Sequence, residues 1–211
     1  MNEFIFLPLP HNSINILNMN TLTKVAIFAS GNGSNAENIA DYFKNIDSIT
    51  IDSFYANKAD AYVIERAKNL GIHCSYYKNS DFREGSIVLD ELQERGVSFI
   101  VLAGFLLKVP ENIIKEFPNK ILNIHPALLP KFGGKGMYGD RVHQAVKEAN
   151  ETESGITIHY VNECFDDGKI VFQAKCEVLE NDSADGIAEK VHALEYRYFP
   201  EVIEKVILKK L

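Results

Sequence analysis

The chain has 211 residues, of which 46% are hydrophobic and 24% charged, a balance typical of a globular protein with a buried core. The net charge is −7, with 22 Lys and Arg residues against 29 Asp and Glu residues. Proteins that coat nucleic acids or bind membrane surfaces carry a basic stripe. We therefore expect no nucleic acid and no membrane among the partners, and the apolar runs are shorter than the ~18 residues of a membrane span.

Residues 1–22 lack the features of a secretory signal peptide. They contain no basic first region and no small-residue cleavage site, and Pro8 and Pro10 interrupt their apolar stretch. We assign this N-terminal extension no function and expect one domain over residues 23–211.

The cysteines are scattered and show neither a disulfide framework nor a zinc-binding spacing. This pattern favours a reducing, cytoplasmic location. The three residues are Cys74, Cys164 and Cys176.

Short apolar runs alternate with helical patterns through the first two thirds of the chain. Runs of this kind, separated by helices of about ten residues, indicate a parallel sheet covered on both faces. Strands are predicted at 24–30, 49–56, 73–77, 98–103 and 121–125, and helices at 36–43, 60–70, 82–95 and 110–117.

After Gly139 the pattern changes to a helix at 140–149 and two strands at 156–161 and 170–178, joined by a turn. A long amphipathic helix is predicted from Ser183 to the end, and Pro200 should kink it. The expected fold is therefore α/β: an open, mostly parallel sheet with helices on both faces, antiparallel last strands and a long C-terminal helix.

The first candidate site is S-G-N-G-S-N at residues 30–35, which follows the first strand and opens the first helix. Glycines there let consecutive N–H groups face an anion, and the positive end of the helix dipole adds to the attraction. The segment also matches a dinucleotide fingerprint loosely, but the second strand ends in Ala56-Asn57-Lys58 without the acidic residue that binds a ribose. A single phosphate is the favoured ligand, and a tight turn without a ligand is the alternative.

The second candidate is I-L-N-I-H-P at residues 121–126. Residues two apart on a strand point to the same face, so Asn123 and His125 present an amide and an imidazole side by side at the strand's carboxyl end. An amide can donate to a developing oxyanion, while an imidazole can move a proton. A polar strand end that only satisfies nearby backbone groups is the alternative interpretation.

The third candidate is Asp166-Asp167-Gly168, which by itself is typical of a hairpin turn. A carboxylate in that turn could approach His125, where its negative charge would favour the protonated imidazole.

Seven segments in order resemble the folate-dependent formyltransferases, over nearly all of the chain from about residue 24. They are V-A-I-F-A-S-G-N-G-S-N (25–35), N-K-A-D-A (57–61), V-L-A-G-F (101–105), L-N-I-H-P-A-L-L-P (122–130), G-I-T-I-H-Y-V (155–161), F-D-D-G (165–168) and Q-A-K (173–175).

The resemblance implies a fold, a reaction and a catalytic trio. The amine of phosphoribosylglycinamide would attack the formyl carbon of 10-formyltetrahydrofolate directly, without a covalent enzyme intermediate or a metal. Asn123 would stabilise the oxyanion, His125 would transfer the proton, and Asp166 would raise the pKa of His125 and organise a water.

The resemblance also implies binding residues, and a monomer or a homodimer is expected. The ribotide would be held by Gly31, Asn32, Gly33, Ser34, Asn35 and Glu195. The folate would lie near Arg83, Leu106, Leu107, Lys108, Val109 and Val161, and beside Asn123 and Asp166.

Two segments depart from the family pattern. Leu107 stands where many relatives carry an arginine, so one contact to the folate tail is expected to be lost. The glycine-rich segment 130–141 is longer than expected and is either a mobile lid or a solvated insertion. His143 and His159 resemble histidines of relatives, and for both we expect packing rather than catalysis.

Other relatives formylate an initiator tRNA or a sugar nucleotide, or release formate to water. The tRNA enzymes carry a further C-terminal domain and would need a basic face, and the hydrolases carry an additional N-terminal domain. From another class, a nucleotide-binding regulatory module would keep the glycine loop but would not need Asn123, His125 and Asp166 together.

Overall fold

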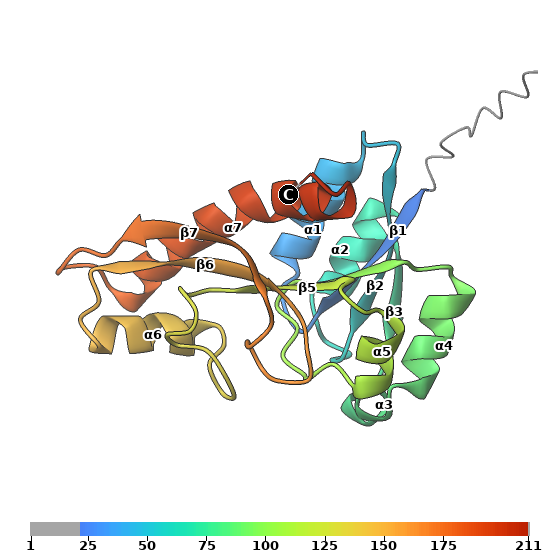
Figure 1. Ribbon diagram of the computed structural model, residues 1–211, viewed down its shortest axis with the longest axis horizontal. Helices are drawn as coiled ribbons and strands as arrows, with labels where there is room; N and C mark the ends of the chain where they lie inside the picture. Colours follow the sequence, from blue (N-terminus) through green and yellow to red (C-terminus); the bar gives the residue numbers. More distant parts are fainter. Residues whose placement is uncertain (1–21, 211) are drawn as a thin grey trace, which may run out of the picture.

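The computed structural model describes residues 22–210. Within them, seven strands form one sheet in the order β3-β2-β1-β4-β5-β6-β7 (Figure 1). The first five strands run parallel, and β6 and β7 are antiparallel to their neighbours. The strands are β1 (Thr23–Ala29), β2 (Ile49–Ala56), β3 (His73–Tyr76), β4 (Phe99–Leu102), β5 (Ile121–His125), β6 (Glu153–Tyr160) and β7 (Ile170–Glu177).

Helices cover both faces of the parallel strands, as the sequence predicts. Strand β1 is buried on both sides: Val25 and Ile27 face one apolar core, and Ala26 and Phe28 face the other. The first core is closed by α1 (Ser34–Phe43), α2 (Val63–Leu70) and α7 (Ala184–Ile207), and the second by α3 (Asn79–Glu84), α4 (Ser86–Glu94) and α5 (Glu111–Glu116). The remaining helix, α6 (Asp140–Glu148), lies beside the β6–β7 hairpin (Figure 1).

Helix α7 packs against α1, beside the parallel strands, and also against the β6–β7 hairpin. Ser183 caps its first turn by accepting a hydrogen bond from the Gly186 N–H at 3.0 Å. Its apolar face is buried against the sheet at Ile187, Val191, Phe199, Val202 and Ile203. Pro200 lies inside this continuous helix, and the kink expected there stays a prediction.

The predicted α/β architecture is confirmed, but several boundaries differ, among them those of two helices and the start of β6, which lies at Glu153 instead of 156. The expected helix at 82–95 is two helices, because Gly85 adopts a left-handed conformation (φ 74°) that ends α3 and starts α4. A Cβ at Gly85 would lie 2.4 Å from Asn112 Oδ1, so the break brings the chain against the start of α5. The expected helix at 60–70 begins only at Val63, and Gly71 ends it as predicted (φ 69°).

The extension predicted at residues 1–22 lies almost wholly outside the described residues, which begin at residue 22. In the part of the chain that the structure covers, no helix combines the length and apolar character needed to cross a bilayer.

Candidate active site

A cavity of about 610 Å³ opens at the carboxyl ends of the parallel strands. It lies where β1 has β2 on one side and β4 on the other, so the loops that follow β1 and β4 diverge there. Open α/β sheets bind ligands at such a point. The loop after β1, the loop after β4, the end of β5, the glycine-rich segment, the Asp166 loop and α7 all contribute to its lining.

The loop after β1 is shaped by one glycine and one buried serine. Gly33 adopts a left-handed conformation (φ 75°) as the N-cap of α1, and a Cβ there would lie 2.5 Å from the Cβ of Val63. Ser30, which is buried, accepts a hydrogen bond on Oγ from the Leu106 N–H at 2.8 Å. The loop therefore holds a fixed shape that turns the N-terminus of α1 toward the cavity, where all five residues of segment 31–35 form part of the lining.

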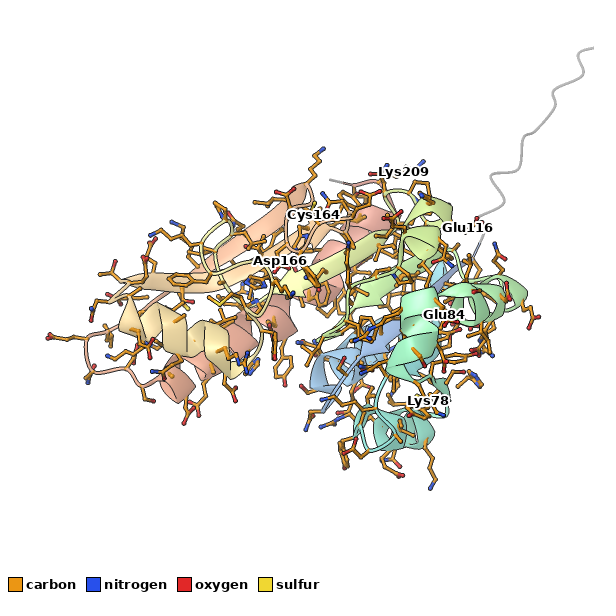
Figure 2. All side chains as sticks on the ribbon, turned by 90° about the horizontal axis from the view of Figure 1, so that it is seen from below. Lys78, Glu84, Glu116, Cys164, Asp166 and Lys209 are labelled. Carbon is orange, nitrogen blue, oxygen red and sulfur yellow. The ribbon has the colours of Figure 1, made fainter. Side chains whose placement is uncertain are left out.

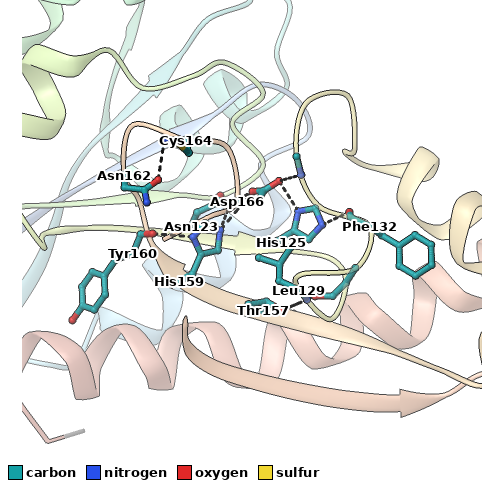
Figure 3. Close-up of polar contacts among 12 residues, drawn as sticks. Asn123, His125, Leu129, Phe132, Thr157, His159, Tyr160, Asn162, Cys164 and Asp166 are labelled. Carbon is teal, nitrogen blue, oxygen red and sulfur yellow. Dashed lines mark hydrogen bonds and ion pairs between the residues drawn. The ribbon is translucent and has the colours of Figure 1, made fainter. Parts of the chain in front are cut away.

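The three predicted catalytic residues come together at the end of β5 (Figure 3). His125 Nδ1 lies 3.5 Å from Asp166 Oδ2, and Asn123 Nδ2 lies 3.4 Å from Asp166 Oδ1. Asp166 lies near the middle of the molecule's long axis (Figure 2). All three side chains line the cavity.

The two ring nitrogens of His125 have different partners. The Phe132 carbonyl oxygen, 2.7 Å from Nε2, can only accept, so Nε2 carries the hydrogen. Nδ1, which faces Asp166, is then the nitrogen that gains or loses a proton. Burial lowers the pKa of His125 below its ordinary value, and the Asp166 carboxylate opposes this only in part. The buried imidazole is therefore neutral at neutral pH, and the Asp166 carboxylate lies close enough to stabilise its protonated form.

Asp166 is held in place by its loop and its neighbours. Its backbone is left-handed (φ 53°), and Oδ2 accepts a hydrogen bond from the Gly134 N–H at 2.9 Å. Burial alone would raise the pKa of Asp166, but contacts with His159, His125 and Gly134 outweigh it and lower the pKa. The carboxyl group is therefore ionised at neutral pH.

His159 holds Asn123, a role that the sequence analysis missed. The two residues are direct partners in the antiparallel register of β5 and β6. The Tyr160 carbonyl accepts a hydrogen bond from His159 Nδ1 at 2.9 Å, so in the neutral ring Nε2 accepts from Asn123 Nδ2 at 3.1 Å. This contact fixes which end of the Asn123 amide is the donor. The same Nε2 of His159 lies 3.6 Å from Asp166 Oδ1, to which only the protonated ring would donate. Thr157 and His159 on β6 are polar residues two positions apart, as Asn123 and His125 are on β5. This shared spacing is the sequence signal from which the role of His159 could have been predicted.

Glu195 is a buried carboxylate on α7 that lines the cavity beside the loop after β1. Its Oε2 accepts a hydrogen bond from Asn35 Nδ2 at 2.8 Å and lies 2.9 Å from His192 Nδ1. The hydrogen bond to Glu195 raises the pKa of His192 despite partial burial. His143, predicted to pack, is buried but also lines the cavity, and burial lowers its pKa.

Comparison with known proteins identifies the family of this chain. Residues 23–203 match the family model described as formyl transferase. The chain is 35% identical over 194 residues to phosphoribosylglycinamide formyltransferase of Bacillus subtilis, covering 88% of this chain and 95% of that protein. The chain belongs to the formyl transferase family. The resemblance inferred from the sequence is thereby confirmed.

Further formyl transferases are similar in sequence and in structure. The chloroplastic phosphoribosylglycinamide formyltransferase of Arabidopsis thaliana is 39% identical over 197 residues, and this chain spans 66% of its length and 89% of its own. The crystal structure of phosphoribosylglycinamide formyltransferase from Anaplasma phagocytophilum matches with a TM-score of 0.81 at 31% identity, covering 90% of this chain and 89% of that one.

In this formyl transferase the residues predicted to bind folate lie in different surroundings. Leu106 lines the cavity, while Leu107 and Val161 pack against the core between the sheet and α3–α5. Val109 is buried at 3% exposure, so little of its side chain is free to form a slot. Arg83, Lys108 and Val109 border a different hollow of about 450 Å³ beside the start of α5. The folate roles of these residues stay predictions.

The glycine-rich segment of the formyl transferase lies against the site. Two of its backbone groups contact the predicted catalytic trio, the Phe132 carbonyl at His125 and the Gly134 N–H at Asp166. Met137 and Tyr138, further along the segment, also line the cavity. Within residues 22–210 no three His, Cys, Asp or Glu side chains form a cluster suited to a metal ion.

Proposed function

We propose that this chain transfers the formyl group of 10-formyltetrahydrofolate to the glycinamide amine of phosphoribosylglycinamide. The observation that carries the proposal is the convergence of Asn123, His125 and Asp166 on a cavity that also contains the glycine loop at the N-terminus of α1. A nucleotide-binding module without catalysis has no need of this trio. The names of the relatives support the same reaction.

The reaction needs one bond to form, one to break and one proton to move. The amine nitrogen attacks the formyl carbon, and the formyl oxygen takes the negative charge. His125 Nδ1 accepts the proton that the amine loses, and the Asp166 carboxylate 3.5 Å away stabilises the resulting imidazolium. The bond from the formyl carbon to the folate nitrogen then breaks, and that nitrogen takes up the proton.

Asn123 is the proposed donor to the oxyanion, and its hydrogen bonds indicate how it becomes available. Its Nδ2 has two hydrogens, and in this structure one is directed at His159 Nε2 and the other at Asp166 Oδ1. The contact with Asp166 is the longer, 3.4 Å against 3.1 Å. We propose that this weaker contact is exchanged for the oxyanion, while His159 keeps the amide in place.

The proposed substrates are assigned to different parts of the cavity lining. The phosphate of the ribotide would accept from the free N–H groups in the first turn of α1, and Glu195 would accept from the ribotide's hydroxyl groups. Partly exposed apolar side chains at Leu106 and Phe165 offer a surface for a flat heterocycle. We therefore propose that the folate binds near Leu106 and that its tail extends toward Arg83 and Lys108, which border the second hollow.

A cytoplasmic location is also proposed. It is supported by three free cysteines, Cys74, Cys164 and Cys176, since free thiols are typical of a reducing compartment. Whether the chain is a monomer or a homodimer stays a prediction.

The test is a formyl-transfer assay that follows folate absorbance, with and without phosphoribosylglycinamide. Formyl transfer that requires the ribotide supports the proposal. Folate turnover without an acceptor would instead indicate a hydrolase, and turnover with another amine alone would indicate another acceptor. We expect His125→Ala to lower kcat at least about a hundredfold, through loss of the base. We expect Ser34→Asp to raise mainly the KM for the ribotide, because its charge repels the phosphate.

A further inference from the structure

Helix α2 contacts the loop after β1 at three consecutive residues. The Val63 N–H donates to the Gly31 carbonyl at 3.2 Å, and Gly33 packs directly against Val63. Arg66 of α2 donates hydrogen bonds to Asn32, the residue between Gly31 and Gly33. The loop that would hold the substrate's phosphate is thus attached along its length to a helix that does not itself line the cavity.

Arg66 is fixed by contacts on every side of its guanidinium. Its Nε donates to the Asn32 carbonyl at 2.9 Å, and Nη2 donates to Asn32 Oδ1 at 2.7 Å. Nη1 forms an ion pair with Glu37 in the first turn of α1, and the guanidinium carbon lies 5.0 Å from the centre of the Tyr62 ring. One side chain therefore ties α2 to both the loop and the helix that follows it.

The two bonds from Arg66 determine the orientation of the Asn32 amide. A guanidinium only donates, so the end of the amide that faces Arg66 must be Oδ1. Nδ2, a donor, is then the end that faces away, and it has no hydrogen-bond partner among the described residues. Asn32 lines the cavity and Arg66 does not. Arg66 therefore acts on the cavity through Asn32.

We infer that Arg66 is a positioning residue for the anionic group of the substrate: it holds the Asn32 backbone and presents the Asn32 amide N–H₂ to that group. The inference rests on the proposed function, which places the ribotide phosphate at this loop. It assigns Arg66 a geometric role. A plain attraction between the Arg66 charge and the phosphate is the competing explanation, and the Glu37 carboxylate offsets that charge.

Arg66→Lys separates geometry from charge, because lysine keeps the charge but cannot donate to two atoms of Asn32 at once. We expect Arg66→Ala and Arg66→Lys each to raise the KM for phosphoribosylglycinamide about tenfold, the size of one lost charge-assisted hydrogen bond. The KM for the folate donor and kcat should stay within about twofold of wild type. Lys68→Ala is the matched control: Lys68 lies on the same helix, is exposed, and has only a 3.9 Å contact with Glu65.

A double-mutant cycle tests whether Arg66 acts through Asn32. Asn32→Ala should raise the ribotide KM, and adding it to Arg66→Ala should raise that KM no more than about twofold further. Calorimetric titration of ribotide into each variant gives binding without turnover, and melting temperatures identify variants that are not folded. Since Asn32→Ala and Arg66→Lys retain much of the local packing, the test does not depend on Arg66→Ala alone.

Three results would overturn the inference: normal ribotide binding in Arg66→Ala, full rescue by Arg66→Lys, or additive effects in the cycle. A fall in kcat and folate affinity equal to the loss of ribotide affinity would also contradict it, since that indicates general disruption. Wild-type chain that binds no ribotide would instead overturn the proposed function, and this inference with it.

Discussion

Asp166→Asn tests the electrostatic part of the proposed mechanism, because the amide keeps the shape of the side chain and removes its charge. At an effective dielectric constant of about 20, two unit charges 3.5 Å apart attract by about 5 kcal/mol. This value is an upper limit on the stabilisation of protonated His125 that Asp166→Asn removes, since the dipole of the new amide restores part of that stabilisation. At a factor of ten per ~1.4 kcal/mol, the ceiling is a loss of a few thousandfold in kcat. We expect a loss of about a hundredfold to a thousandfold.

The pKa of His125 gives an independent measurement of the same effect. The carboxylate raises the pKa of His125 against the effect of burial, so its removal should lower that pKa further. An NMR titration of the His125 ring in both proteins measures this shift, and the folate-absorbance assay measures kcat. Asp167→Asn, the same change at the exposed neighbouring position, is the control and should leave both quantities unchanged. The reasoning is refuted if Asp166→Asn retains near-normal turnover, or if the His125 pKa rises.

Two further changes test the support around the trio. We expect His159→Ala to lower kcat about tenfold, because the Asn123 amide loses the acceptor that orients it. Unchanged turnover in steady-state assays would show that the amide needs no such partner. We expect Gly168→Ala to lower the free energy of unfolding by about 1–3 kcal/mol in urea titrations, since its Cβ would lie 1.6 Å from the Tyr160 carbonyl oxygen. Gly186→Ala, which meets only ordinary contacts inside a helix, should not destabilise the chain, and equal losses in both variants would contradict the steric argument.

The sheet was predictable because its strands are short, apolar and separated by clear helical patterns. The predicted strand at 121–125 coincides with β5, and the predicted strand at 49–56 coincides with β2. These runs are buried in the parallel sheet, so local sequence and tertiary environment favour the same conformation.

The break at Gly85 was not predictable from the same patterns. An isolated glycine inside a helical pattern is tolerated in many helices, and the space that a Cβ at Gly85 would need is filled by Asn112 and Pro110 at the start of α5. These neighbours come from another part of the chain, and no periodicity along one helix reveals them.

The candidate site likewise contains residues that the sequence predicts and features that only the fold determines. Asn123 and His125 could be proposed from strand geometry, because residues two apart share a face. The role of His159 depends on the register between β5 and β6, which pairs it with Asn123 and is set by the fold. Which nitrogen of His125 is free to take a proton depends on the Phe132 carbonyl, a backbone group whose position no sequence motif encodes.

The hydrogen bond between Asn35 and Glu195 joins side chains 160 positions apart in the chain. During synthesis the glycine loop emerges from the ribosome before its partner on α7, which is made 160 residues later. A nascent chain that has already folded its parallel strands therefore still has an incomplete cavity at their carboxyl ends.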